Sequence, residues 1–130
     1  MSCGAGDVTE GSYVARVLLV EQEESFSDAL SYQLRREGFQ VAVCPTGSDA
    51  LDVFDRDGAD LVLLDLMLSG LPGTAVCQGL RERSDVPVIM LSARDTEVDK
   101  AIGLGVGADD YVTKPFCWRD LAVRIRAVLG

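Results

Sequence analysis

Five short apolar segments alternate with five segments of helical periodicity along the chain, and this alternation constrains the fold more than any other feature. Most of the apolar segments are short runs of valine and leucine, which is typical of strands buried on both faces. Strict alternation of strands and helices predicts an α/β fold, in which helices cover both faces of a doubly wound parallel sheet. The expected strands are Arg16–Val20, 39–43, 61–64, 87–91 and Asp110–Thr113, and the expected helices centre on 26–34, 50–54, 76–80, 98–102 and 121–129.

The size and charge of the chain exclude several classes of protein. Its 130 residues suit a single domain, and no linker or internal repeat divides them. The formal net charge of −9 disfavours binding to nucleic acid or to an anionic membrane surface. The sequence contains no histidine, which excludes histidine general bases and histidine-bound metals within the chain.

The sequence also lacks signals for export or membrane insertion. Its longest apolar runs are far shorter than a bilayer-spanning helix. Residues 1–15 lack the apolar core of a signal peptide, so we predict a flexible leader there and the folded domain over residues 16–130. The four cysteines, at positions 3, 44, 77 and 117, form no Cys-x-x-Cys pair, which predicts reduced thiols in a cytoplasmic protein.

Polar side chains follow four of the five expected strands. Glu21, Gln22 and Glu23 come after the first strand, Asp65 ends the third, and Ser92 and Lys114 follow the fourth and fifth. The carboxyl ends of parallel strands meet at one edge of the sheet, where ligands bind in folds of this class. An acidic residue after a strand can simply cap the next helix. The combination of acids, a hydroxyl and a lysine nevertheless favours a functional site.

Four segments together resemble one known family, the receiver domains of two-component response regulators. They are 17–23 (VLLVEQE), 63–67 (LLDLM), 91–94 (LSAR) and 107–116 (GADDYVTKPF), and the resemblance covers residues 16–129. The last segment resembles the OmpR/PhoB subfamily most closely, particularly its actinobacterial members. The resemblance implies a flavodoxin-like, CheY-like (βα)5 fold with strand order 2-1-3-4-5.

The resemblance also implies a phosphoacceptor chemistry and the residues that perform it. A sensor histidine kinase would donate a phosphoryl group to a carboxylate beside Mg²⁺ in a self-modifying reaction, so the domain is not expected to be a turnover enzyme. The lysine and serine would contact the phosphoryl group, and the serine and a tyrosine would act as the switch. The implied residues are Asp65 (acceptor), Glu21, Gln22, Asp65 and the Met67 carbonyl (metal), Lys114 and Ser92 (phosphoryl contacts), Ser92 and Tyr111 (switch) and Pro115 (cis peptide).

Members of the subfamily dimerise through the fourth helix, fifth strand and fifth helix, and they bind DNA through a C-terminal winged-helix domain. The resemblance therefore implies a homodimer and, in the full-length protein, an output domain that this chain does not contain. The expected ion pairs are Lys100 with Asp120, Asp110 with Arg124 and Asp109 with Arg126, around an apolar patch that includes Leu104.

Gln22 is the most serious departure from the family pattern, because an aspartate is expected at that position. A glutamine carbonyl is a weaker ligand than a carboxylate for a hard cation, so the sequence predicts weakened Mg²⁺ affinity. Glu21 and Glu23 remain acidic and are able to compensate. Gly105 also replaces an expected glutamate, which removes one ion pair and predicts a short or mobile fourth helix.

Two alternatives to a phosphorylated receiver remain. One is an atypical receiver that acts as a phosphorylation-independent interaction module, and the other is a stand-alone flavodoxin-like binding protein.

Two further motifs are interpreted as turns. The segment 103–108 fits the pattern G-x-G-x-x-A but closes a helix, and 55–58 resembles only part of a calcium loop.

Overall fold

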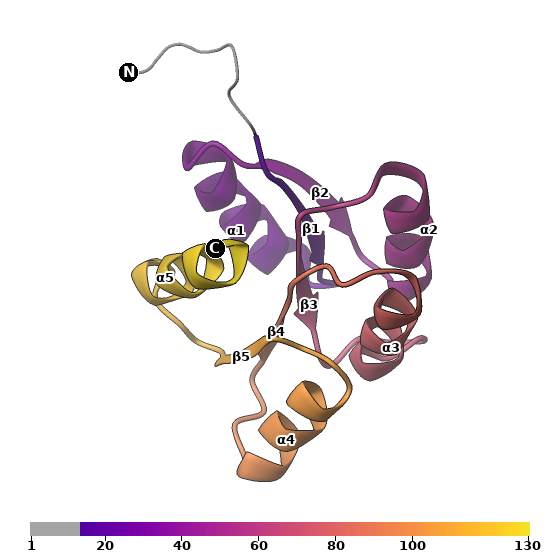
Figure 1. The fold of residues 1–130 in the computed structure, drawn as a ribbon. Helices are drawn as coiled ribbons and strands as arrows, with labels where there is room; N and C mark the ends of the chain where they lie inside the picture. Colours follow the sequence, from indigo (N-terminus) through magenta and orange to yellow (C-terminus); the bar gives the residue numbers. More distant parts are fainter. Residues whose placement is uncertain (1–13) are drawn as a thin grey trace.

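A five-stranded parallel sheet lies between two layers of helices in the computed structural model, which describes residues 14–130 (Figure 1). The strand order is β2-β1-β3-β4-β5, so the predicted doubly wound fold is confirmed. The strands are β1 (Arg16–Val20), β2 (Gln40–Cys44), β3 (Leu61–Asp65), β4 (Val88–Ser92) and β5 (Asp110–Thr113). The helices are α1 (Glu24–Arg36), α2 (Gly47–Asp57), α3 (Gly73–Arg83), α4 (Glu97–Gly105) and α5 (Trp118–Leu129).

Both faces of the sheet are buried, and successive residues of β1 show how. Val17 and Leu19 point toward α1 and α5, where they join a cluster that includes Leu34. Leu18 and Val20 point the other way, into a second cluster that residues of α2 and α3 complete. Figure 1 shows α1 and α5 together on one side of the sheet and α2 and α3 on the other. This two-sided burial explains why the strands are continuous apolar runs.

Two glycines end helices at the motifs that the sequence analysis interpreted as turns. Gly58 ends α2 with φ of 71°, and Gly107 follows α4 with φ of 116°. These angles lie in the left-handed region that glycine adopts at little cost. The motif 103–108 thus lies at the end of α4 and not between a strand and a helix, which excludes a dinucleotide-binding turn there.

β4 begins one residue later than the sequence predicted, at Val88 instead of Pro87. Proline has no N–H group to donate into a strand ladder, although its carbonyl accepts the Val62 N–H at 2.9 Å. The shift brings Ser92 into the last position of β4, where its backbone is fixed by pairing with Thr113 of β5.

Gly73 packs directly on the backbone that follows β3, where the predicted acceptor Asp65 lies. A Cβ atom at Gly73 would lie 2.8 Å from the Leu66 Cα, and the Asp65 carbonyl oxygen is closer still. We expect Gly73→Ala to lower the free energy of unfolding by at least about 1 kcal/mol, since backbone must move. Gly105→Ala is the matched control: this helical glycine has open space around it, and alanine should stabilise α4 by up to about 1 kcal/mol. Urea unfolding of both variants measures the difference, and equal stabilities would contradict the packing role of Gly73.

The described part of the chain contains no helix long and apolar enough to span a membrane. Cys44 and Cys77 are buried free thiols, and Cys117 is an exposed one. Cys3 and most of the predicted leader, residues 1–13, lie outside the described residues.

Candidate functional site

The carboxyl ends of β1, β3 and β5 bring three predicted site residues into contact. The Lys114 ammonium lies 2.7 Å from Glu21 Oε1 and 3.6 Å from Asp65 Oδ2. Glu21 is only 2% exposed and Asp65 7% exposed, so both carboxylates are largely removed from water. The lysine charge offsets the cost of burying two anions, which explains why this group of charges is stable inside the sheet edge.

Backbone N–H groups orient both carboxylates. The Met67 N–H donates to Asp65 Oδ1 at 2.9 Å, and the Glu23 N–H donates to Glu21 Oε2 at 3.0 Å. Each carboxylate therefore has one oxygen held by the backbone and one directed toward Lys114. Burial raises the pKa of the Glu21 carboxyl, and the nearby charge of Asp65 acts in the same direction, whereas hydrogen bonds from Lys114 and the Glu23 N–H oppose the rise.

Gln22 lies next to this group but is directed toward a different partner. Its side-chain Oε1 accepts a hydrogen bond from the Ser69 N–H at 2.8 Å and so connects the loop after β1 to the loop after β3. The sequence predicted only a metal-binding role for Gln22. The amide oxygen that would serve a metal is occupied by the backbone of Ser69 in this conformation.

The predicted switch residues Ser92 and Tyr111 meet at the backbone of Arg94. The Ser92 hydroxyl accepts the Arg94 N–H at 3.1 Å, and the Tyr111 hydroxyl donates to the Arg94 carbonyl at 2.7 Å. Ser92 is fully buried, and Tyr111 is 7% exposed with its ring close to Gly103 of α4. The loop that contains Arg94 thus connects Ser92 to the ring of Tyr111, which lies against α4.

The loop between β5 and α5 includes a cis peptide bond between Lys114 and Pro115, as the resemblance implied. From the sequence, Phe26 was only part of the helix expected around residues 26–34, and its contact with the site was not predicted. The Lys114 Nζ lies 4.0 Å from the centre of the Phe26 ring. Helical periodicity gave no signal for this contact, because it joins residues far apart in the sequence.

The expected dimer residues lie along α4, β5 and α5, and several already have partners within the chain. Arg124 pairs with Asp110 at 2.9 Å and with Asp120 at 3.4 Å. Asp109 Oδ2 accepts hydrogen bonds from Arg81 of α3 and from the Val88 N–H. The Lys100 ammonium lies 3.9 Å from Glu97, while Leu104 and Arg126 are exposed.

The described residues contain no group of three or more acidic, cysteine or histidine side chains that could hold a metal ion. The available donors at the sheet edge are the two carboxylates of Glu21 and Asp65. Such a pair is compatible with Mg²⁺, which commonly binds through one or two carboxylates and retains several waters. The residues therefore fit the ion, with one acidic ligand fewer than the family pattern has, because Gln22 stands where that pattern has an aspartate.

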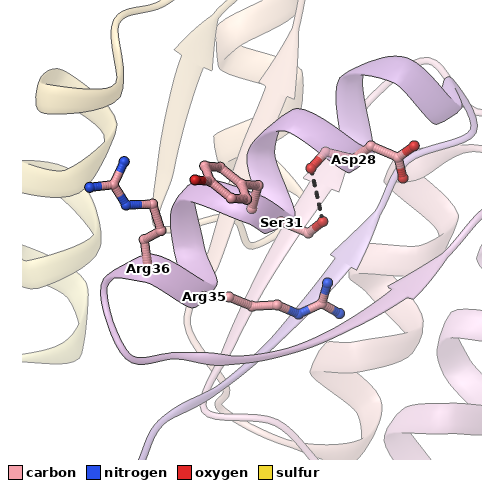
Figure 2. A pocket seen from close by; sticks show the side chains of 5 residues that line it. Asp28, Ser31, Arg35 and Arg36 are labelled. Carbon is pink, nitrogen blue, oxygen red and sulfur yellow. Dashed lines mark hydrogen bonds between the residues drawn. The ribbon is translucent and has the colours of Figure 1, made fainter.

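One surface hollow lies away from these residues, on the outer side of α1 (Figure 2). Its volume is about 490 Å³, and all of its lining residues belong to that one helix. The Ser31 hydroxyl donates to the Asp28 carbonyl, and the Arg36 guanidinium lies over the Tyr32 ring at 5.8 Å. These contacts are local to the helix. The charged group at the sheet edge, and not this hollow, is therefore the candidate site.

Comparison with known proteins agrees with the family resemblance that the sequence motifs carry. Residues 17–126 match the family model described as the response regulator receiver domain. The chain is 62% identical over 113 residues to sensory transduction protein RegX3 of Mycobacterium bovis, a match that covers 87% of this chain and 50% of the relative. RegX3 of Mycolicibacterium smegmatis is 61% identical over the same length and with the same coverage. The chain thus spans about half the length of the curated relatives that it matches.

Solved structures show the same fold. The BeF3-activated receiver domain of RstA from Klebsiella pneumoniae has a TM-score of 0.85 at 32% identity, and the match covers 88% of this chain and 97% of that one. The receiver domain of sensor histidine kinase PA1611 from Pseudomonas aeruginosa, with a magnesium ion in its active site cleft, has a TM-score of 0.84 at 27% identity and coverage of 91% and 99%. These similarities do not favour the two alternatives to a phosphorylated receiver. The fold, the grouped acid, lysine and hydroxyl residues and the family match agree, and the chain belongs to the response regulator receiver domains, with RegX3 of the OmpR/PhoB type among its relatives.

Proposed function

We propose that Asp65 accepts a phosphoryl group from the phosphohistidine of a sensor kinase. The carboxylate oxygen forms a bond to phosphorus as the bond from phosphorus to the histidine nitrogen breaks, which leaves an aspartyl phosphate and a neutral imidazole once that nitrogen is protonated. The observation that supports this most is the Lys114 ammonium at 3.6 Å from Asp65 Oδ2, because it places a positive charge where phosphoryl oxygens must arrive. The reaction modifies the domain once and is not a turnover.

Three residues of the chain would assist this transfer. Lys114 would exchange its carboxylate partners for the phosphoryl oxygens, and Ser92 would donate its hydroxyl once the loop that carries Arg94 moves. Tyr111 shares that loop through the Arg94 carbonyl, so a movement of the loop would reach the surface of α4 and β5. When bound, Mg²⁺ would neutralise charge between the acceptor and the phosphoryl group, and Glu21, Asp65 and the Met67 carbonyl would hold it. Gln22 would be a weak fourth ligand only if its Oε1 gave up the hydrogen bond from the Ser69 N–H.

Incubation with acetyl phosphate and Mg²⁺ tests this function. We expect the intact protein to gain the mass of one phosphoryl group, and reduction of the acyl phosphate with borohydride should label the peptide that contains Asp65. Omission of Mg²⁺ should prevent the gain. No mass gain at any Mg²⁺ concentration would contradict the proposal.

We further propose that the face formed by α4, β5 and α5 forms a two-fold dimer. Asp110 and Arg124 pair within the chain at 2.9 Å, and in a symmetric dimer the same two side chains would be able to pair across the interface. Asp109 is less available for a pair with Arg126, because its Oδ2 atom is already shared by Arg81 and the Val88 N–H.

Charge reversal separates the two arrangements of Asp110 and Arg124. We expect Arg124→Glu alone and Asp110→Arg alone each to weaken self-association by about 2- to 30-fold, since two exposed pairs per dimer become repulsive. The double variant should recover it. A mixture of the two single variants should form mixed dimers only if the pair crosses the interface. Sedimentation velocity measures all four samples, and unchanged association in both single variants would exclude these residues from the interface.

The properties of the whole protein are also proposals, because this chain spans only about half the length of its curated relatives. The kinase partner, the winged-helix DNA-binding domain and the cytoplasmic location follow from the family resemblance alone. We propose that DNA binding by the whole protein depends on the state of Asp65. The net charge of −9 disfavours DNA binding by this chain itself.

A further inference from the structure

Phe26 contacts the one positively charged group of the site. It is the third residue of α1, and the face of its ring lies against Lys114, with Nζ 4.0 Å from the ring centre. The same ammonium lies 2.7 Å from Glu21 Oε1 and 3.6 Å from Asp65 Oδ2. Lys114 is therefore surrounded by two carboxylates and one aromatic face, and its side chain is only 17% exposed.

The position of the Phe26 ring is itself fixed by a second aromatic residue. Phe116 meets it at a centroid distance of 5.9 Å with the two rings nearly perpendicular, at 87°. Edge-to-face pairs at this separation are favourable beyond the area they bury. Phe116 lies two residues after Lys114, so one short segment contacts the Phe26 ring twice, through the ammonium and through the second ring.

An aromatic face has a specific effect on an ammonium group. The negative charge of the π-system attracts the cation, and the ring excludes water from that side of it. An ammonium without the ring would hydrate freely on this side and sample other rotamers, because lysine has a long flexible stem. The ring thus limits Lys114 to orientations in which its N–H groups point toward Glu21 and Asp65.

We propose that Phe26 is a positioning residue that holds the Lys114 ammonium beside Asp65 through a cation–π contact. This inference rests on the proposed phosphoacceptor function, in which Lys114 must be in place when phosphoryl oxygens arrive. Phe26 itself touches no reacting atom. It reduces the freedom of the lysine before transfer, so less ordering is left for the transition state.

The contact is tested first in the unmodified protein. NMR should show nuclear Overhauser effects between the Phe26 ring protons and the ε-methylene protons of Lys114. The ring current should shift those methylene protons upfield of an exposed lysine. Absence of both signals would overturn the proposal without any variant.

Three variants then separate positioning from packing. Phe26→Leu keeps an apolar side chain in α1 but removes the aromatic face, so the Lys114 methylene protons should move to the position of an exposed lysine. Phe26→Tyr keeps the face and should retain the upfield shift. Phe39→Leu is the matched control, since Phe39 packs against the same cluster of α1 and α5 but lies immediately before β2. It should leave the Lys114 signals unchanged.

The rate of phosphoryl incorporation from acetyl phosphate provides the functional measurement. We expect Phe26→Leu to lower the rate constant by about 2- to 30-fold, the range that corresponds to a cation–π contact. Phe26→Tyr should retain the rate of the unmodified protein, and so should Phe39→Leu. An equal loss in Phe26→Leu and Phe39→Leu would reduce Phe26 to general packing and overturn the proposal.

The outcome distinguishes this inference from the proposed function. If the unmodified protein incorporates phosphate and Phe26→Leu does so at the same rate, the positioning role is wrong and the phosphoacceptor function stands. If the unmodified protein incorporates none, the phosphoacceptor function fails, and with it the catalytic purpose of the contact. The NMR signals would then still decide whether Phe26 holds Lys114.

Discussion

Asp65→Asn is expected to abolish phosphoryl incorporation from acetyl phosphate and from any kinase donor, while the fold stays intact. The amide has nearly the same shape as the carboxylate, but its nitrogen and oxygen are too weakly nucleophilic to attack phosphorus. The Met67 N–H should still find an oxygen acceptor, which preserves the loop after β3. Lys114 would keep its shorter contact with Glu21 at 2.7 Å, so the buried charges stay paired. Intact-mass spectrometry measures the incorporation, and circular dichroism reports the fold.

A second carboxylate in the neighbourhood provides the control for this prediction. Asp95→Asn removes an exposed acid from the loop between β4 and α4, close in sequence to Ser92 but outside the group formed with Lys114. This variant should incorporate phosphate as the unmodified protein does. Incorporation that persists in Asp65→Asn would assign the acceptor to another residue. Loss in both variants would indicate a disturbed loop and not a lost nucleophile.

The sequence alone predicted the fold well because the strands are buried on both faces. Val17 and Leu18 point to opposite sides of the sheet and both are almost fully buried, so the apolar run admits no half-exposed alternative. Two strands were predicted one residue too early: β2 begins at Gln40, and β4 begins at Val88. At β4 the apolar side chain of Pro87 resembled a strand residue, although proline cannot donate into the ladder. Strand order came from the family resemblance, since periodicity does not determine which strands are neighbours.

The candidate site was predictable only where it depends on backbone topology. Glu21, Asp65 and Lys114 each end or follow a strand, so a parallel sheet brings them to one edge whatever their rotamers. The contact between Gln22 and the Ser69 N–H was not predictable, because it depends on the conformations of two loops. The same holds for Asp109, which the resemblance assigned to a dimer but which bonds Arg81 and Val88 within the chain. Side-chain partners across long sequence separations require the folded structure.

Gln22→Asp is expected to tighten Mg²⁺ binding by about 10- to 100-fold, which corresponds to about 1.4–2.7 kcal/mol. The group formed by Glu21, Asp65 and Lys114 contains two negative charges and one positive charge, and a third carboxylate would strengthen its attraction for a divalent cation. An aspartate would also supply the hard anionic oxygen that the amide lacks. Phosphorylation should consequently become faster at low Mg²⁺. Isothermal titration calorimetry with MgCl₂ measures the affinity directly.

The same substitution should destabilise the metal-free protein, by about 1 kcal/mol or more, for two separable reasons. The new charge would repel Glu21 and Asp65, and the shorter side chain would lose the hydrogen bond that Gln22 accepts from the Ser69 N–H.

Two further variants separate these causes. Gln22→Asn shortens the side chain without adding charge, and Gln22→Glu adds charge while keeping the length that reaches Ser69. Thermal unfolding of the three variants with EDTA and with excess Mg²⁺ separates the causes. If charge dominates, Gln22→Asp and Gln22→Glu lose stability in EDTA and recover it in Mg²⁺, whereas Gln22→Asn gains no more stability from Mg²⁺ than the unmodified protein does. Equal Mg²⁺ affinity in Gln22→Asp and the unmodified protein would mean that Glu21 or Glu23 already provides the missing ligand, and that the glutamine does not weaken the site.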